Sequence, residues 1–352
     1  MKGQSTSMHV VVTGGAGYIG SVLVPMLLER GARVTVLDRC YFGVESLREP
    51  QARHGDALRV VRSDVRRVDS GVFEGADALV DLSGISNDPS CELDEELTRS
   101  VNLEGSRRSH RLALAAGARR IVFVSSCSVY GHASGLDLHE GSPLRPVSLY
   151  ARCKAEVEQT ALELGSSSGA CVTVLRLATV FGVSPRMRFD LAVNVMTKNA
   201  YVNRRIVVDG GGRQWRPFVH VRDVAECVAR TLDADERSVA GQVLNVGRND
   251  CNSRIANLAY RVRDAMPGTE IVTTKSDPDR RDYRVNFDKL RRVLDWTPSR
   301  TIDDGIAELR EALRDGSIDP DDRRTSTLAQ YAFLAEVERT FREMQLDGRI
   351  LA

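Results

Sequence analysis

The chain has 352 residues, enough to bury the core of one large domain or of two closely packed lobes, and its 49 basic and 48 acidic side chains almost cancel. This balance gives no electrostatic reason to expect nucleic acid or an anionic membrane surface as a partner. No apolar run reaches the roughly 18 residues of a membrane span, and the seven cysteines form no CxxC pair or metal-ligand spacing, which predicts a soluble cytoplasmic protein without a metal site.

Short β-branched runs alternate with helical patterns in the first half of the chain. The predicted order is strand 9–13, helix 18–30, strand 33–37, strand 78–82, helix 93–116, strand 120–125, helix 148–164 ending at Gly165, and strand 171–177. These strands are almost continuously apolar, as expected when helices cover both faces of a parallel sheet. The pattern predicts an α/β fold of the Rossmann type, a doubly wound parallel sheet.

Beyond Gly182 the pattern becomes irregular and predicts a smaller, mixed C-terminal lobe that binds the substrate. We expect a dinucleotide-binding domain in residues 1–182 together with 218–248, which return to the main sheet, and the substrate lobe in 183–217 and 249–319. Residues 320–352 are expected to form a helical extension. Its helix, 327–344, carries an apolar stripe that would pack on the body or on a second subunit, made of Leu328, Tyr331, Leu334, Val337 and Phe341.

A glycine-rich turn, TGGAGYIG, follows the first predicted strand and precedes a helix. Gly14, Gly17 and Gly20 would let the chain turn tightly and let backbone N–H groups approach a pyrophosphate. The second strand ends in Asp38, whose carboxylate is placed to accept hydrogen bonds from a ribose 2′-hydroxyl and would repel a 2′-phosphate. The pattern therefore predicts NAD as the cofactor, although the neighbouring Arg39 leaves NADP open as the weaker alternative.

Tyr150 and Lys154 stand four residues apart on one face of a predicted helix. A free tyrosine has a pKa near 10, but a nearby ammonium and a cationic nicotinamide favour the phenolate. Ser126, at the end of a predicted strand, could then orient a substrate hydroxyl while Tyr150 takes its proton and a hydride leaves for the cofactor. Serine hydrolysis is a poor rival, because the chain has no GxSxG motif.

With these motifs in place, residues 9–315 resemble the extended short-chain dehydrogenase/reductase family, in its nucleotide-sugar epimerase/dehydratase branch. The segments that carry the resemblance are TGGAGYIG, SSCSVYG, YARCK and RQWRPFVHVRDVA. The resemblance implies a nucleotide-diphosphate sugar as substrate. It also implies a homodimer that pairs the helices at about 93–116 and 148–164 in a four-helix bundle.

The resemblance further implies roles for residues at matching positions. Around the cofactor these are Tyr18 and Ile19, the adenine-contacting pair Asp64 and Val65, the turn Leu82, Ser83 and Gly84, the supporting Asn102, and Leu177 and Val180 beside the nicotinamide. For the sugar nucleotide they are Ser126 and Ser128, with Asn194, Arg216 and Arg281 as diphosphate contacts and Arg280 as an equal alternative to Arg281. In the atypical segment after Gly84, Ser86 and Asn87 could face the sugar.

Two departures from the family pattern narrow the reaction. Family 4,6-dehydratases carry an acidic pair where this chain has Cys127 and Ser128, which cannot serve as acid and base for the loss of water. Many epimerases have an asparagine where Thr179 stands. We therefore expect an NAD-dependent epimerase, acting at C4 through a transient keto-sugar. The alternatives left open are a nucleotide-sugar reductase, dehydrogenase or decarboxylase, and a non-catalytic cofactor-sensing protein.

Overall fold

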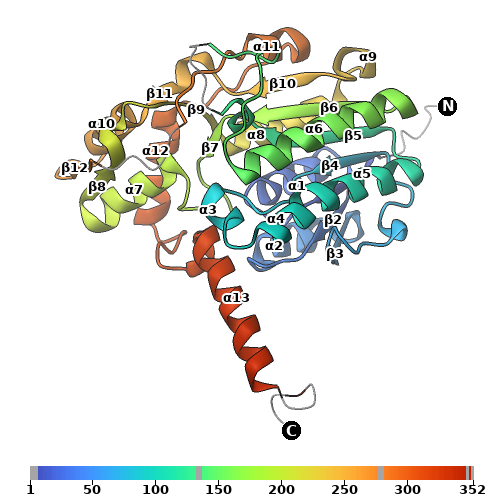
Figure 1. Ribbon diagram of the computed structural model, residues 1–352, viewed down its shortest axis with the longest axis horizontal. Coiled ribbons are helices and arrows are strands. Elements are labelled where there is room, and N and C mark those ends of the chain that lie inside the picture. Colours follow the sequence, from blue (N-terminus) through green and yellow to red (C-terminus); the bar gives the residue numbers. More distant parts are fainter. Residues whose placement is uncertain (1–6, 132–136, 276–280, 346–348, 350–352) are drawn as a thin grey trace.

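A computed structural model describes residues 7–131, 137–275, 281–345 and 349. Its centre is a seven-stranded parallel sheet in the order β10-β6-β5-β4-β1-β2-β3, which confirms the predicted Rossmann-type fold (Figure 1). The strands are β1 (His9–Thr13), β2 (Arg33–Asp38), β3 (Leu58–Arg62), β4 (Ala78–Asp81), β5 (Arg120–Ser126), β6 (Cys171–Leu177) and β10 (Val243–Val246).

The direction in which strands are added to the sheet reverses between β1 and β4. The chain runs from β1 outward to β2 and β3, then returns to the other side of β1 with β4 and continues to β5 and β6. In register, Val10 of β1 lies between Val34 of β2 and Ala78 of β4. Open α/β sheets bind ligands outside the carboxyl ends of their strands at such a reversal. Thr13, Asp38 and Ser126, which end β1, β2 and β5, share this edge.

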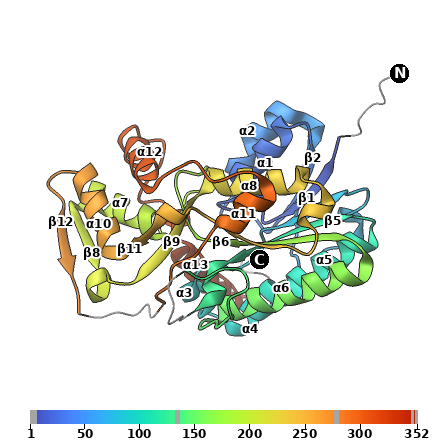
Figure 2. The same ribbon diagram turned by 90° about the horizontal axis from the view of Figure 1, so that it is seen from above.

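Helices cover both faces of the sheet, as Figure 2 shows. One face carries α1 (Gly20–Glu29), α2 (Glu45–His54) and α8 (Val221–Asp233), and the other carries α4 (Glu95–Arg99), a π-helical turn (Ser100–Gly105), α5 (Ser106–Ala115) and α6 (Leu149–Ser168). Short helices connect these layers: α3 (Asp88–Cys91), α9 (Glu236–Val239), α11 (Asp288–Leu294) and the 3-10 turns Gly55–Ala57, Ser70–Val72, Cys127–Tyr130, Asp209–Gly212, Asn249–Cys251 and Arg323–Thr325.

The prediction that Gly165 ends the Tyr150 helix is wrong, because α6 continues to Ser168 and stops at Gly169, which has φ +73°. Gly165 lies inside the helix where it crosses the sheet. A Cβ atom at this position would lie 2.6 Å from a methyl carbon of Val172 on β6. Here the glycine permits close packing of helix on strand and does not break the helix.

The smaller lobe contains two further sheets and its own apolar core. A three-stranded sheet has the order β11 (Asn252–Arg254), β9 (Trp215–His220) and β7 (Thr179–Phe181), and β8 (Arg205–Val208) pairs with β12 (Glu270–Thr273). Helices α7 (Ala192–Asn203), α10 (Ile255–Ala265) and α12 (Ile302–Arg314) pack around them. The prediction that residues 218–248 return to the main domain is therefore correct only in part. Helix α8 and strand β10 belong to the main domain, whereas β9 lies in the three-stranded sheet of the smaller lobe. The buried residues of β9 suit either sheet, so its composition does not distinguish them.

The C-terminal helix α13 (Thr327–Met344) has the predicted bounds, but only its first turns pack on the body (Figure 1). Thr327 and Gln330 are buried, whereas Phe341 and Met344 near its far end are 49% and 61% exposed. The body thus covers the predicted stripe only in part, and the packing of the stripe on a second subunit stays a prediction. In the described part of the chain, no helix combines the length and apolar character needed to cross a membrane.

Helices α5 and α6 lie against each other on the outer face of the main domain, in the region predicted to form a dimer. The structure contains one chain, so the homodimer and its four-helix bundle stay predictions.

Candidate active site

The glycine-rich turn between β1 and α1 has the geometry of a phosphate cradle. Gly14 has φ +71°, and a Cβ atom on it would lie 2.9 Å from the backbone carbonyl of Leu82. At the other end, a Cβ on Gly20 would lie 2.5 Å from the Cα of Gly15. Helix α1 begins without a side-chain cap at Ile19 and without an acidic residue in its first turn. An uncapped helix start and the positive end of the helix dipole favour an anion, so this is where a pyrophosphate would be expected.

Asp38 lies at the end of β2 and holds the glycine-rich turn. Its carboxylate accepts hydrogen bonds from the backbone N–H of Ala16 at 3.0 Å and of Cys40 at 2.7 Å. Burial raises the pKa of Asp38, while these two bonds and the charge of Arg186 act in the opposite direction. A carboxylate has about four acceptor positions, so capacity remains for a ribose hydroxyl.

The predicted adenine-contacting pair lies beside Asp38, where β3 ends. Asp64 accepts hydrogen bonds from the backbone and guanidinium of Arg66, at 2.7–2.9 Å, and Val65 is buried. Arg39 approaches the same Asp64 carboxylate at 3.4 Å. Because Arg39 already faces a carboxylate, it is poorly placed to bind the 2′-phosphate of NADP.

The turn after β4 is fixed by two buried polar groups. Asp81, at the end of the strand, accepts hydrogen bonds from the hydroxyls of Thr13 and Ser83 and contacts the ring of His110 at 3.0 Å. Asn102, in the π-helical turn, binds both the N–H and the carbonyl of Ile85. Gly84 lies against the Asn102 side chain. Asn102 thus holds the turn after β4 in place, and the role near the cofactor that the resemblance implies for it stays a prediction.

Ser126, Tyr150 and Lys154 meet at the carboxyl end of β5. Ser126 lies close enough to the Tyr150 phenol to favour its charged form, and the Ser126 hydroxyl accepts the backbone N–H of Ser128 at 3.1 Å. Ser148 caps α6 by accepting the N–H of Ala151, which fixes the first turn of the helix. The ammonium of Lys154 lies 6.0 Å from the centre of the Tyr150 ring.

The electrostatic surroundings of Tyr150 contain a cation that the sequence did not suggest. Burial raises the pKa of Tyr150 above its ordinary range, and Cys91 and Asp88 act in the same direction. Opposing them are the charge of Arg188 and the hydrogen bond to Ser126. Burial also lowers the pKa of Lys154, against the charge of Asp81. The phenol therefore needs further positive charge nearby to act as a base at neutral pH.

Arg188 belongs to a polar network that joins the two lobes. Its guanidinium forms two hydrogen bonds with Asp190, at 2.9 and 3.0 Å, and Asp190 also accepts one from Asn87 at 2.5 Å. Asn87 follows Ser86 in the turn after β4 and has φ +72°, an unusual value for a non-glycine residue. This network brings the segment predicted to face the sugar close to Tyr150, the predicted base.

Two residues predicted to contact ligands, Asn194 and Tyr18, form hydrogen bonds within the protein. Asn194 donates to the Tyr18 hydroxyl at 3.1 Å and to the Arg188 carbonyl at 2.8 Å, so both of its amide hydrogens are used. Tyr18 in turn donates to the carbonyl of Gly182 at 2.6 Å. These contacts hold the smaller lobe on the start of α1. The predicted contacts of Tyr18 with the cofactor and of Asn194 with the diphosphate stay predictions.

Arg216 and Arg281 lie together, and their predicted contacts with a diphosphate stay predictions. The Arg216 guanidinium donates to the backbone carbonyl of Arg281, and Arg281 pairs with Asp88 of α3 at 3.1 Å. Arg280, the alternative contact, lies outside the described residues. Ser128 is 4% exposed, and its hydroxyl has no partner among the described residues, which leaves it available to a substrate hydroxyl. Leu177 is buried, and Ile19, Leu82, Val180 and Ser86 are partly buried.

A nucleotide-binding Rossmann fold with a Ser–Tyr–Lys site at the end of β5 defines the class of dinucleotide-dependent oxidoreductases and isomerases. Comparison with known proteins identifies the family within this class. The model of the NAD-dependent epimerase/dehydratase family matches residues 10–247. The chain belongs to this family and is an NAD-dependent enzyme.

Relatives within the family differ in the reaction that they catalyse. A dTDP-glucose 4,6-dehydratase from Actinoplanes sp. is 29% identical over 324 residues, which cover 86% of this chain and 96% of the relative. A UDP-glucose 4-epimerase from Corynebacterium glutamicum is 24% identical over 313 residues, covering 84% and 92%. Among solved structures, DesIV, a dTDP-glucose 4,6-dehydratase from Streptomyces venezuelae with NAD bound, has a TM-score of 0.77 at 26% identity and covers 89% and 99%.

Proposed function

We propose that this enzyme is a nucleotide-sugar epimerase that inverts a sugar hydroxyl, at C4, through a transient ketone. The observation that carries the proposal is the grouping of Ser126, Tyr150 and Lys154 at the end of β5 without an acidic pair beside it. Cys127 is 1% exposed and directs its thiol to the carbonyl of Arg176, and burial raises its pKa far above the ordinary value. It is therefore not placed to act as an acid in the loss of water.

The residues of the chain supply binding and proton transfer. Ser126 holds the substrate oxygen, and Tyr150 takes the hydroxyl proton when the ketone forms and returns it when the alcohol is restored. Lys154 and Arg188 provide positive charge near the phenol. Bound NAD supplies the reversible hydride acceptor. Ser86, Ser128, Arg216 and Arg281 would bind the nucleotide sugar, and guanidinium groups match the geometry of phosphate oxygens.

The position of α13 favours an epimerase over a reductase or dehydrogenase. The Gln330 side chain donates to the carbonyl of Tyr41 at 2.8 Å, and the Tyr331 ring packs edge-on against Tyr41 and Phe42. These residues follow Asp38, so α13 covers the end of the crevice where the adenosine ribose would lie. A cofactor that is covered in this way exchanges slowly, which suits an epimerase because it regenerates NAD in each cycle.

The test is to incubate the purified protein with UDP- and dTDP-hexoses without added cofactor. An epimerase gives a product of unchanged mass that nuclear magnetic resonance identifies as the C4 epimer, and denatured protein releases stoichiometric NAD. A product that has lost one water identifies a dehydratase, and one that has lost carbon dioxide identifies a decarboxylase. Turnover that requires added NADH or NADPH identifies a reductase. Tyr150→Phe that keeps the biological role of the protein would indicate a cofactor sensor.

A further inference from the structure

Arg186 is a buried cation without a carboxylate partner. It is 8% exposed, and the structure gives it no ion pair with any described residue, while its Nε also has no hydrogen-bond partner among them. Two steps further along the chain, Arg188 is equally buried but is matched by Asp190. A buried, unpaired guanidinium is costly in free energy unless a ligand supplies the negative charge. Burial and the nearby Arg188 accordingly lower the pKa of Arg186 to about 9.

The backbone around Arg186 is fixed to the first turn of α1. The N–H of Arg186 donates to the Ser21 hydroxyl at 3.3 Å, and the Ser184 hydroxyl donates to the carbonyl of Tyr18 at 2.7 Å. The start of α1 is the place where the glycine-rich turn directs its N–H groups toward a pyrophosphate. The segment after β7 thus lies next to the expected position of the phosphates.

The backbone of Arg186 contacts α1, and its side chain extends from there toward the loop after β2. Its guanidinium carbon lies 3.6 Å from the centre of the Phe42 ring, and its charge acts on Asp38. Its Nη2 donates to the hydroxyl of Thr327 on α13 at 3.3 Å. Arg186 therefore lies between the helix that would bind the pyrophosphate and the carboxylate that would bind the ribose, beneath the covering helix.

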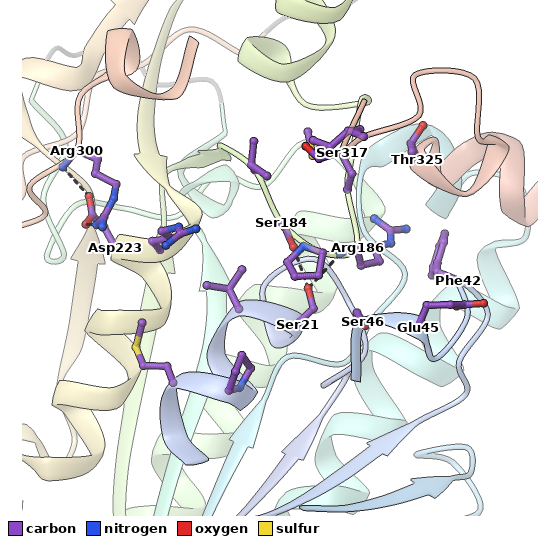
Figure 3. A pocket seen from close by; sticks show the side chains of 18 of the residues that line it. Ser21, Phe42, Glu45, Ser46, Ser184, Arg186, Asp223, Arg300, Ser317 and Thr325 are labelled. Atoms are coloured by element: carbon purple, nitrogen blue, oxygen red, sulfur yellow. Dashed lines mark hydrogen bonds and ion pairs between the residues drawn. The ribbon is translucent and has the colours of Figure 1, made fainter. Parts of the chain in front are cut away.

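Arg186 also differs from the arginines around it. Figure 3 shows it on the wall of a cavity of about 820 Å³ on the outer side of α1, together with Ser21, Phe42 and Thr325. The other arginines that line this cavity each face a carboxylate: Arg300 faces Asp223 at 2.7 Å, Arg324 faces Glu45 at 3.3 Å and Arg222 faces Glu308 at 3.8 Å. Among the four arginines that line this cavity, Arg186 is the one without an ion pair to a described carboxylate.

We propose that Arg186 binds the pyrophosphate of NAD from the substrate-lobe side, opposite the glycine-rich turn, and that Thr327 of α13 holds its guanidinium in place. The inference rests on the dinucleotide site of the proposed function and not on the C4 chemistry. It gives the C-terminal extension a role in cofactor retention, because α13 both covers the crevice and orients a phosphate ligand.

The experiment compares ADP, which carries the pyrophosphate, with adenosine, which does not. Dinucleotide-free samples of the full chain, prepared with charcoal, are titrated with each compound by calorimetry. For Arg186→Gln we expect ADP to bind about tenfold more weakly or worse, the loss expected for a charge-assisted hydrogen bond, and adenosine affinity to change by less than about twofold. Thr327→Val should weaken ADP binding in the same direction, by a smaller factor. The matched control, Arg324→Gln, removes a cation at the rim and should change neither affinity.

Thermal unfolding of the same samples separates ligand binding from a structural role. Because Arg186 has no ion pair to lose, ligand-free Arg186→Gln should melt at or above the temperature of the ligand-free parent, while the rise in melting temperature on adding NAD should be smaller. Unchanged ADP affinity, an equal loss of ADP and adenosine affinity, or ADP that binds without competing with NAD would each overturn the proposal. If Arg186→Gln does not fold, Arg186→Lys replaces it, because lysine keeps the charge but lacks the paired donors of the guanidinium. Arg186→Lys should then weaken ADP binding and leave adenosine binding unchanged, and equal changes for the two compounds would overturn the proposal.

Discussion

Lys154 donates its hydrogen bond to the backbone carbonyl of Val124, 2.9 Å away, and not to the hydroxyl of Tyr150. The ammonium also lies 4.7 Å from the centre of the Phe123 ring. Both contacts anchor Lys154 to β5, beneath the point where the nicotinamide end of the cofactor would lie. The two side chains therefore share no hydrogen bond in this structure, and an effect of Lys154 on Tyr150 would act through its charge, 6.0 Å from the centre of the ring.

Replacing Tyr150 with phenylalanine should abolish the proton transfer and leave the cofactor bound. General acid–base catalysis contributes about 10²–10⁴-fold to a rate, so we expect turnover by Tyr150→Phe to fall by at least about 100-fold, with the NAD content of the purified protein unchanged. Initial rates and chromatography of the released dinucleotide measure the two quantities. Tyr260→Phe, at a tyrosine 49% exposed on the surface, is the matched control and should keep full activity. Equal rates for the two variants would exclude Tyr150 as the base.

Removing the charge of Arg188 should shift the pH profile of the enzyme. Arg188 lowers the pKa of Tyr150 against the effect of burial, so its removal raises that pKa and the phenolate forms only at higher pH. The acid limb of log kcat/KM should therefore move to higher pH by about one unit, as expected for the loss of one nearby opposite charge.

The suitable variant for this experiment is Arg188→Gln with Asp190→Asn, since the single change would leave the Asp190 carboxylate buried without its partner. Because the double variant also removes a negative charge, its shift should have the same direction but be smaller than for the loss of Arg188 alone. Arg222→Gln, at a side chain 56% exposed, serves as the control and should leave the profile in place. A shift of the acid limb to lower pH would contradict the assignment.

Asp38 should determine the choice between NAD and NADP. In Asp38→Asn the charge that repels a 2′-phosphate is gone, and one of the two acceptors for the N–H groups of Ala16 and Cys40 is replaced by a donor. We expect NAD binding to weaken about tenfold, the effect of losing a hydrogen bond to a charged group, while NADP binding weakens less or improves. Fluorescence titration with NADH and NADPH gives the ratio. An unchanged ratio would mean that Asp38 only supports the glycine-rich turn.

Gly20→Ala should remove cofactor binding by blocking the cradle. Its Cβ would lie 2.5 Å from the Cα of Gly15 and 2.6 Å from the carbonyl oxygen of Gly14, so the turn must open or the helix must move. We expect at least about a 100-fold loss of NAD affinity by calorimetry, because the N–H groups of the turn lose their common direction. Gly71→Ala is a matched control on the surface, where the nearest atom would lie 3.8 Å away. NAD affinity equal to that control would show that the turn can adapt.

Local motifs were the predictable part of this molecule. Gly14, Asp38 and the pair Tyr150 and Lys154 each follow from the residue types within one strand, turn or helix, and the structure brings them to one edge of the sheet. Arg186 and Arg188 were missed because they lie in a segment without periodicity, after β7. Their positions depend on how that segment packs on α1 through Ser184, a contact between residues far apart in the sequence.

The same limit applies to the sheets. β9 has the apolar composition of a strand, but nothing in its sequence states that its neighbours are β7 and β11 instead of β6. The partner of a strand follows from long-range packing, which the local pattern does not contain. Long-range packing also explains the wrong prediction that Gly165 ends α6. The glycine is needed inside the helix because Val172 of β6 lies against it, and the local sequence does not show this contact.

Breaking the buried ion pair between Arg176 and Glu158 should strongly destabilise the protein. Arg176 on β6 and Glu158 on α6 are 5% and 3% exposed, and the closest approach of their charged groups is 2.6 Å. Ser125 donates to the same carboxylate, and Arg176 donates to the hydroxyl of Tyr130 at 3.0 Å. The pair thus ties the helix that carries Tyr150 to the sheet.

Arg176→Met would leave the Glu158 carboxylate buried and unpaired, and we expect it to lower the free energy of unfolding by about 3–5 kcal/mol. Urea denaturation measures this loss. The control is Arg237→Met, whose side chain is 92% exposed beside Asp235 and which should change stability by no more than about 0.5 kcal/mol. The double variant Arg176→Met with Glu158→Met removes both charges and should recover part of the loss, because an apolar pair carries no unpaired charge. A double variant less stable than Arg176→Met alone would show that the hydrogen bonds of Glu158 to β5, and not the pairing of charge, hold α6 on the sheet.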